Sequence, residues 1–455
     1  MDAKFLNATV VTCDDTRRVL HSAGVAVLGG RIAAVGSSEE IARAYPQLPS
    51  IDASGKALLP GIVNAHTHVL LLALRGTVED MTSEVIYSYM TPISFAMNNA
   101  EREAIALLGC LEAIRSGTTT LVEPFRHVVH YAGAMAATGM RLWFSENCAD
   151  ALTLKIRSGV YEFDRSWGEQ FLQRQTALIE KFHGTHAGRV HCQVAAHAPD
   201  NCSPWMLRQL NDLAAKHSVR RTVHMAQSRQ EVAQVQRYAG CTPAQYLEKN
   251  DWLGPDLVGA HWTFCTPEDI TLLARHGVHM AHCPANSSRR GPHQAPLAKI
   301  VDTGVNVALG TDNMTEDMFQ AMTIGSIVHR GSRGGGIEPK PQALLDAATR
   351  NGALSLGRLD ELGSIETGKK ADLTIIDLDH PSLRPAINLV SNIVHYGHPG
   401  VVDSVMVDGE FLMRDGKVLC LDEKKVVADA QAATRSAWRR LCEQSPEVPL
   451  PPALS

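Results

Sequence analysis

The 455-residue sequence lacks long hydrophobic runs, paired cysteine motifs and an excess of basic charge, and each absence excludes a class of protein. No stretch approaches the ~18 uninterrupted apolar residues that a membrane span needs. The ten cysteines are scattered with no C-x-x-C pair, which favours reduced thiols over a disulfide framework. A net charge of −5, with both signs interspersed, argues against nucleic acid or an anionic membrane as a partner.

The first residues, Met-Asp-Ala-Lys-Phe-Leu-Asn, lack the basic start and apolar stretch of a secretory signal, so we expect a cytoplasmic protein. A hydrophobic content of 45% and a charged content of 20% are typical of a soluble globular chain. The length exceeds what one ordinary core accommodates. We therefore expect one large α/β domain with a smaller one, and a small molecule as substrate.

Both ends of the chain contain β-branched runs separated by glycine, the pattern of a small antiparallel sheet. Examples are Gly24–Leu28 near the start and Ala371–Asp377 near the end. The expected organisation is a β-sandwich built from both termini around a barrel. Its boundaries are 1–57 for the first part of the sandwich, 58–365 for the barrel, 366–425 for the second part, and 426–455 for a C-terminal helix and proline-rich tail.

In the middle of the chain, strand-like runs alternate with helical stretches. The predicted strands are the run before His66 and residues 118–122, 141–144, 190–194, 221–224, 257–260, 278–281 and 306–309. Helices are predicted between them, at 101–116, 203–217, 230–238 and 267–276 among others. Eight such units in succession predict a closed (β/α)8 barrel of the TIM type, in the α/β class.

Polar residues follow the predicted strands at their carboxyl ends, which meet around one mouth in such a barrel. His66 and His68 lie one residue apart, so an extended strand directs both imidazoles to one face. On its own this pair could equally be packed or solvated. The later strand ends add His197, His224, His261, His282 and Asp312. Because a hydrolytic metal needs imidazoles, a carboxylate and an open position for water, we predict His66, His68, His224 and Asp312 as metal ligands, with His261 beside them.

Several motifs in this order resemble the amidohydrolase superfamily, and most closely its cytosine deaminase and triazine hydrolase branch. They are Leu59-Pro-Gly-Ile-Val-Asn-Ala-His-Thr-His68, Ser116-Gly-Thr-Thr-Thr120, His282-Cys-Pro284, Ala308-Leu-Gly-Thr-Asp312 and Gly363–Leu373. The resemblance runs from about residue 4 to residue 420. It implies a metal-containing barrel with a terminal β-sandwich, Asp312 as the group that relays the proton of the attacking water, and His261 as a catalytic or further coordinating histidine. It also implies that His197 contacts substrate and that the protein is a homo-oligomer.

We expect one divalent metal ion per subunit, with zinc as the first choice and iron, cobalt or manganese suited to the same ligands. The strand over residues 190–198 carries no lysine, so the carboxylated-lysine bridge of binuclear relatives is absent. Glu123, at the end of the strand over residues 118–122, is the alternative bridge between two ions.

Gln227 departs from the family pattern, in which His-x-x-Glu supplies a proton shuttle to a ring nitrogen. An amide cannot exchange a proton at ordinary pH, so either Glu231 or Glu123 replaces the shuttle or the chemistry does not need one. The second interpretation favours cleavage of a C–N or C–S bond in an amide, urea, carbamate or thiocarbamate. It also suggests kinship with the molinate hydrolase and phenylurea hydrolase group.

Two other functions stay open. One is an aminohydrolase, or dechlorinating hydrolase, of an N-heterocycle such as a pyrimidine, purine or s-triazine. The other is a non-catalytic family member. Beside Gln227, we predict that His197, His293 and Trp262 contact substrate. We expect the rest of the substrate pocket wall to come from Met81–Met97, Trp143, Phe144 and Phe264. Their apolar side chains suit a neutral, hydrophobic molecule.

Overall fold

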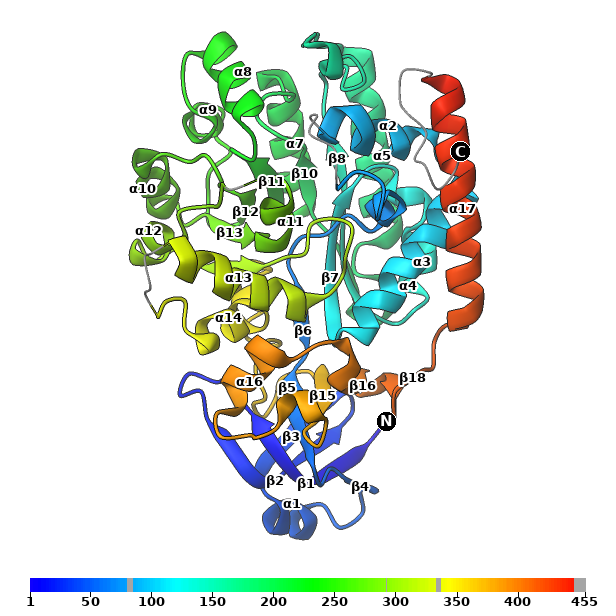
Figure 1. Ribbon diagram of the computed structural model, residues 1–455, viewed down its shortest axis with the longest axis vertical. Coiled ribbons are helices and arrows are strands. Elements are labelled where there is room, and N and C mark those ends of the chain that lie inside the picture. The colour runs from blue at the N-terminus through cyan, green and yellow to red at the C-terminus, as the bar shows by residue number, and fades with distance from the viewer. Residues whose placement is uncertain (80–84, 292, 333–336, 446–455) are drawn as a thin grey trace.

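The computed structural model describes residues 1–79, 85–291, 293–332 and 337–445. A barrel of parallel strands forms one part of the molecule, and a curled sheet from both ends of the chain lies below it (Figure 1). The barrel strands are β6 (Ile62–Asn64), β7 (Thr118–Phe125), β8 (Arg141–Cys148), β9 (Val190–Cys192), β10 (Val194–Ala196), β11 (Arg221–Met225), β12 (Leu257–His261), β13 (His279–His282) and β14 (Val307–Leu309).

Eight strand positions result, because β9 and β10 form one strand interrupted at Gln193. The backbone N–H of Ala65 donates to the carbonyl of Leu309 at 2.9 Å and so joins the first position to the last. This confirms the predicted (β/α)8 barrel. Each strand returns through a helical connection, as parallel pairing requires.

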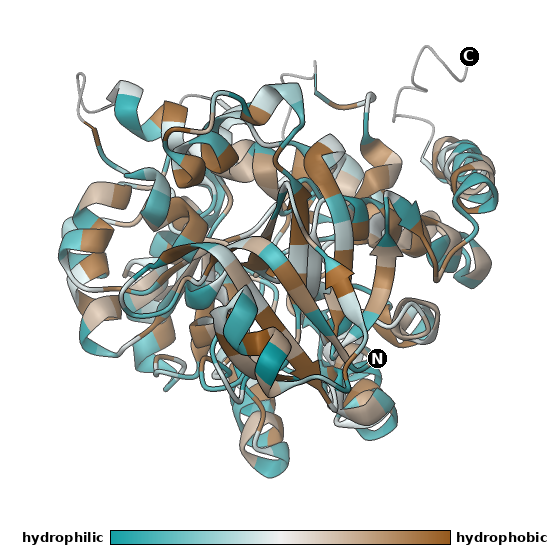
Figure 2. Ribbon diagram, turned by 90° about the horizontal axis from the view of Figure 1, so that it is seen from below, coloured by the Kyte–Doolittle hydropathy of each residue, from teal (hydrophilic) through white to brown (hydrophobic). Residues whose placement is uncertain are grey.

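Helices surround the barrel and occupy most of the connections. They are α2 (Thr91–Ala96), α3 (Asn99–Arg115), α4 (Ala132–Ala136), α5 (Arg165–Phe182), α6 (Thr185–Gly188), α7 (Pro204–His217), α8 (Arg229–Ala239), α9 (Pro243–Lys249), α10 (Pro267–Arg275), α11 (Pro284–Arg289), α12 (Leu297–Asp302), α13 (Met318–Ser332), α14 (Pro341–Ala347) and α15 (Arg350–Ser355). Several begin with a side-chain cap; Ser203, for example, accepts from the N–H of Met206. Figure 2, viewed from the side of the small sheet, shows brown strands inside and mixed teal and brown helices around them.

The small domain is one hydrogen-bonded sheet of nine strands. These are β1 (Ala3–Val11), β2 (Val19–Leu28), β3 (Arg31–Ser37), β4 (Ser50–Asp52), β5 (Lys56–Pro60), β15 (Leu373–Asp377), β16 (Val402–Val407), β17 (Glu410–Arg414) and β18 (Lys417–Val418), with helices α1 (Ser38–Ala44) and α16 (Leu389–Tyr396) at its margins. β5 pairs with β15, so the expected boundary at 57/58 falls inside a strand of this sheet. Phe5, Val25 and Leu373 share one core, which joins the two ends of the chain.

The small sheet packs against the amino ends of the barrel strands and leaves their carboxyl ends open. Arg141, the first residue of β8, is 1% exposed and forms ion pairs with Asp372 and Asp408 of the small domain. The Thr374 hydroxyl donates to the carbonyl of Gly117, directly before β7, at 2.6 Å. The functional mouth of the barrel therefore lies on the far side from this junction.

The C-terminal helix α17 (Glu423–Gln444) runs beside α3 on the outside of the barrel (Figure 1). Its Trp438 is fully buried and donates its indole N–H to the carbonyl of Ala73 at 2.8 Å. The proline-rich tail predicted after this helix lies outside the described residues. Among the described helices, none combines the length and apolar character needed to cross a bilayer.

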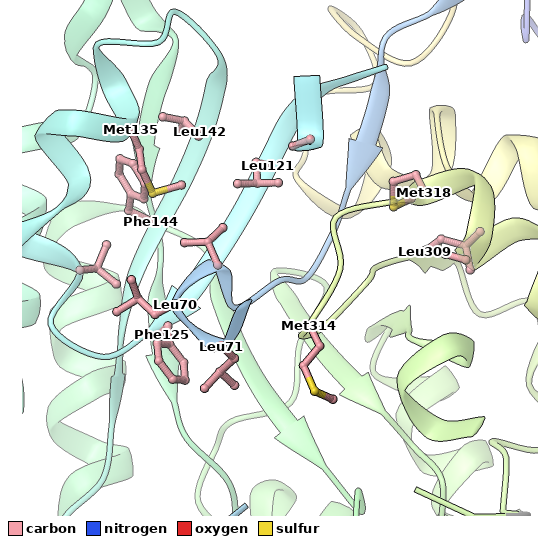
Figure 3. Packing of buried hydrophobic residues seen from close by; sticks show 14 of the residues in the cluster. Leu70, Leu71, Leu121, Phe125, Met135, Leu142, Phe144, Leu309, Met314 and Met318 are labelled. Atoms are coloured by element: carbon pink, nitrogen blue, oxygen red, sulfur yellow. The ribbon is translucent and has the colours of Figure 1, made fainter. Parts of the chain in front are cut away.

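A hydrophobic layer supports the loop that follows the first barrel strand. The 3-10 helix η1 (Val69–Leu74) begins directly after His68, and all six of its residues are buried. Figure 3 shows its Leu70 and Leu71 beside Phe125 of β7. Packing of this apolar turn fixes the backbone that carries the two histidines of the first strand.

Candidate metal centre

Four histidines and one aspartate gather at the carboxyl end of the barrel. The Nε2 atoms of His68 and His224 lie 3.1 Å apart. One oxygen of Asp312 lies 3.4 Å from His68 Nε2 and 3.9 Å from His66 Nε2, and the other lies 3.7 Å from His261 Nε2. All five side chains are at most 4% exposed. The structure thus brings together all four predicted metal ligands and the predicted catalytic histidine.

The imidazole nitrogens at the centre of this cluster are available as metal ligands, because the rings are neutral. His224 donates from Nδ1 to the carbonyl of His197 at 2.6 Å, which leaves a lone pair on Nε2. Among the described residues, His66 has no hydrogen-bond partner on either ring nitrogen, and His261 has none on Nε2. Burial lowers the pKa of His66, His68 and His261 well below the usual value, so the imidazoles are neutral. This donor set fits a divalent metal ion.

Asp312 combines a ligand position with a raised pKa. Burial raises the pKa of its carboxyl to about 6, although the positive charge of Arg290 acts in the opposite direction. Asn286 donates its side-chain amide to one carboxylate oxygen. A backbone hydrogen bond also holds Asp312 in place, because its N–H donates to the carbonyl of His66 at 2.9 Å. A carboxyl group with this pKa can accept and return a proton near neutral pH.

Two residues of the centre adopt left-handed backbone conformations. The φ angle is +80° at His261 and +65° at Asp312, which is strained for residues with a Cβ. Hydrogen bonds across the barrel hold both segments: the N–H of His68 donates to the carbonyl of Asp312 at 2.6 Å, and that of Trp262 to Met225 at 3.0 Å. Strain concentrated at these residues is typical of a functional site.

A buried polar network lies behind the two histidines of the first strand. Thr67 faces away from its neighbours His66 and His68 and donates its hydroxyl to the Glu316 carboxylate at 2.7 Å. Asn64 donates to the same carboxylate at 3.1 Å and to the Thr311 hydroxyl at 2.8 Å. Glu316 could not be predicted from the sequence, because a lone glutamate after the eighth strand has no distinguishing pattern.

Close backbone contact also requires a glycine at the eighth strand end. A Cβ added to Gly310 would lie 2.7 Å from the carbonyl oxygen and 2.9 Å from the nitrogen of His66. Only glycine lets the two strands approach this closely and places Asp312 against the histidines.

A cavity of about 360 Å³ leads from the surface to the centre. His261, Gln227, His293 and Phe264 line it, and their contact with substrate stays a prediction. Arg229, Arg289 and Arg290 add positive charge. Trp262 does not line it: the side chain is fully buried, because the left-handed backbone at this residue (φ +55°) places it against Gly259. Met90 belongs to the wall, whereas Met81 lies outside the described residues.

Trp143 and Phe144 are also buried away from this cavity. Trp143 stacks on His191 with ring centroids 4.6 Å apart, and Phe144 belongs to the core outside the strands. Alternation along β8 turns the two rings to opposite faces of the strand, and Trp143 packs there with Val63 and Leu362. His282 pairs with His329 at 2.8 Å and is no member of the ligand groups found among the described residues.

Neither glutamate considered as a substitute shuttle is directed into the cavity. The carboxylate of Glu231 accepts from the N–H groups of Ala226 and Gln227, at 2.7 and 2.8 Å, and so fixes the turn that carries Gln227. Glu123 accepts from the Tyr131 hydroxyl at 2.7 Å and from the N–H of Val69 at 3.0 Å. Burial raises the pKa of Glu123 to about 8. Both groups hold backbone near the site.

His197 lines a second, smaller chamber of about 20 Å³ next to the cluster. Arg126 and Asn147, from the ends of β7 and β8, line it together with His68, His224 and Gln227. Arg126 and Asn147 carried no signal in the sequence beyond their place at strand ends.

Comparison with known proteins places this geometry in a family. The amidohydrolase family matches residues 57–412, and an imidazolonepropionase-like composite domain of bacteria matches residues 23–47. The chain is 30% identical over 433 residues to the 5-methylthioadenosine/S-adenosylhomocysteine deaminase of Pelotomaculum thermopropionicum, with 93% of this chain and 96% of that protein covered. It is also 30% identical to the 5'-deoxyadenosine deaminase of Methanosarcina mazei, over 96% of this chain and 98% of that protein.

Solved structures agree with the fold. An adenosine deaminase from Xanthomonas campestris with bound zinc gives a TM-score of 0.86 at 25% identity, covering 96% of this chain and 98% of that one. The zinc complex of atrazine chlorohydrolase from Arthrobacter aurescens gives 0.85 at 23% identity, over 95% and 100%. Together with the neutral, unpartnered imidazoles around Asp312, these findings confirm the superfamily predicted from the motifs. The chain belongs to the amidohydrolase family and is a metal-dependent hydrolase that acts on carbon–nitrogen bonds.

Proposed function

We propose that the chain is an aminohydrolase that displaces an amino group from a ring carbon of an N-heterocycle, with one zinc ion as cofactor. The observation that carries the proposal is the end-to-end similarity to nucleoside deaminases, which covers 93 and 96% of this chain, combined with a complete set of ligands. A cavity of about 360 Å³ has room for a ring of this size. This is the alternative of the sequence analysis, and the relatives favour it over acyl cleavage.

The side chains at the carboxyl end of the barrel have different roles in the reaction. When bound, a divalent metal lowers the pKa of water towards neutrality. Asp312 takes the proton of the attacking water and passes it to the leaving amine, a task suited to its pKa of about 6. His261 holds the entering oxygen from the other side of the Asp312 carboxylate, 3.7 Å away. Gln227 donates its amide N–H to the ring without protonating it.

A second candidate is hydrolysis of an amide, urea or carbamate. Gln227 favours it, because attack on an acyl carbon needs no protonated ring nitrogen. Both candidates use the same ligands and the same cavity, and they differ in the carbon that is attacked.

A substrate panel separates the two. Zinc-loaded protein is incubated with amino-substituted rings, both neutral (adenosine, cytosine and melamine) and acidic (ammelide), and separately with phenylureas and carbamates, and the released amine is identified. We expect ammonia release from at least one ring compound and no turnover in Asp312→Asn. Removal of zinc by a chelator should abolish turnover, and restoring zinc should recover it. Turnover of ureas or carbamates alone would refute the aminohydrolase and support the second candidate.

A further inference from the structure

The small chamber beside the histidine cluster is lined by hydrogen-bond donors that lack acceptors. Arg126 is 2% exposed, Asn147 is 1% exposed, and both line this chamber of about 20 Å³. The Nε atom of Arg126 and both side-chain polar atoms of Asn147 have no partner among the described residues. Unsatisfied polar groups at such depth are costly unless something else binds them.

His197 adds a third donor at the same place. Its Nδ1 accepts from the side-chain amide of Asn201 at 2.6 Å. The neutral ring therefore carries its hydrogen on Nε2. That atom lies 3.5 Å from the guanidinium of Arg126, so two donors face each other. An acceptor placed between them would satisfy both.

The charge of Arg126 is also uncompensated. Within the described ranges, no carboxylate lies within 4.0 Å of its guanidinium. Glu146, which attracts Arg126 electrostatically, is paired with Arg174 at 2.6 Å and accepts from two backbone N–H groups. The rings of Phe125 and Phe95, at 5.5 and 5.9 Å, offer cation–π contact only. A buried cation without a counter-charge is unfavourable, so the missing anion is a candidate ligand.

Two further features favour negative charge in this chamber. Arg290 lines it as well, 4.0 Å from an oxygen of Asp312. Gln227 lines it with a neutral amide at the position where the deaminase pattern has a carboxylate. Asp312 is therefore the one carboxylate in the described lining of the chamber, and it belongs to the metal centre.

We propose that Arg126, with Asn147 and His197, binds a deprotonated oxygen or nitrogen on the substrate ring, so that the substrate is an anionic N-heterocycle. The inference rests on the proposed function and narrows its substrate class. Arg126 is a specificity-determining residue: its charge-assisted hydrogen bond selects the anion. It also stabilises negative charge on the ring during attack, in place of a protonating acid.

The test compares two ligands of nearly equal size on the zinc-loaded protein. Barbiturate is an anion at neutral pH and uracil is neutral. Titration calorimetry should give at least tenfold tighter binding of barbiturate to the unaltered protein. Arg126→Gln should remove the difference, and Arg126→Lys should retain part of it. As a control, Arg275→Gln on the outer surface of the barrel should leave both affinities unchanged.

Outcomes of this test and of the substrate panel are independent. Equal affinities for barbiturate and uracil, or an undiminished preference in Arg126→Gln, would overturn the anionic substrate even if heterocyclic amines are hydrolysed. A panel that shows only urea or carbamate turnover removes the aminohydrolase, whatever the calorimetry gives. If Arg126→Gln loses zinc or unfolds, Asn147→Leu, of similar volume, must weaken barbiturate more than uracil.

Discussion

Replacing Gly310 by alanine should damage the metal centre more than the fold. The added Cβ would lie 2.7, 2.9 and 3.0 Å from the carbonyl oxygen, the nitrogen and the Cβ of His66. Two of these atoms belong to the backbone of His66 and the third is its first side-chain carbon, so no rotation of the side chain relieves the contact. Since comfortable separations are about 3.5 Å, the segment with His66 must retreat by about 0.8 Å. Metal–ligand distances tolerate only about 0.2 Å.

The expected cost has two parts. Overpacking of this kind destabilises by about 1–3 kcal/mol, measured by urea unfolding of the zinc-free protein. Loss of ligand orientation weakens metal binding by about 10- to 100-fold, measured by zinc competition with a chromophoric chelator. Gly331→Ala in α13 is the matched control, because no described residue lies within 4 Å of its added Cβ. It should keep zinc affinity and gain up to about 1 kcal/mol. Unaltered zinc affinity in Gly310→Ala would refute the reasoning.

Three further predictions concern buried charge. Arg141→Met leaves Asp372 buried without a cation and Asp408 with Lys370 alone, and should lower the free energy of unfolding by about 3–5 kcal/mol in urea; a loss below about 1 kcal/mol would contradict this. Burial raises the pKa of Glu123 from 4.5 to about 8, so the folded state holds a proton that the unfolded state releases, and stability falls as pH rises across that window. Glu123→Gln should flatten this slope in unfolding measured from pH 5 to 8, and an unchanged slope would exclude Glu123 as its source. Gln227→Glu adds negative charge to the chamber and should weaken barbiturate binding about tenfold at unchanged zinc content, equivalent to about 1.4 kcal/mol, while unweakened binding would argue against the anion site.

The metal ligands could be predicted because they follow a repeated physical rule. Each one lies at or just after the end of a predicted strand, and the parallel strands of a barrel end at one mouth. His66, His224 and Asp312 are far apart in sequence, yet this rule alone places them together. The same rule failed for Trp262, because two consecutive left-handed residues, His261 and Trp262, end the strand's alternation and no periodic pattern reports that conformation.

The donors of the small chamber could not be predicted for a different reason. Arg126 follows β7 as a single basic residue, and such residues at strand ends are usually solvated or paired. What distinguishes it is the absence of a carboxylate near it among the described residues, which is a property of several elements at once. Glu316 is similar, since its role depends on contacts with both Thr67 and Asn64, which the strand pattern alone does not bring to one side.

Gln227 and Arg126 together explain how a deaminase-like centre could work without its usual acid. A neutral ring needs a proton on its nitrogen before the ring carbon accepts an oxygen, and glutamate normally supplies it. An anionic ring needs instead a fixed positive charge beside the atom where electrons accumulate, and a carboxylate at residue 227 would oppose it. The guanidinium of Arg126 is buried in the same chamber as the Gln227 amide. The cation at residue 126 and the lack of a carboxylate at residue 227 therefore both favour an anion in this chamber. On this reasoning Gln227 does not mark a lost function; the charge of the substrate has changed, and the side chain facing it has changed accordingly.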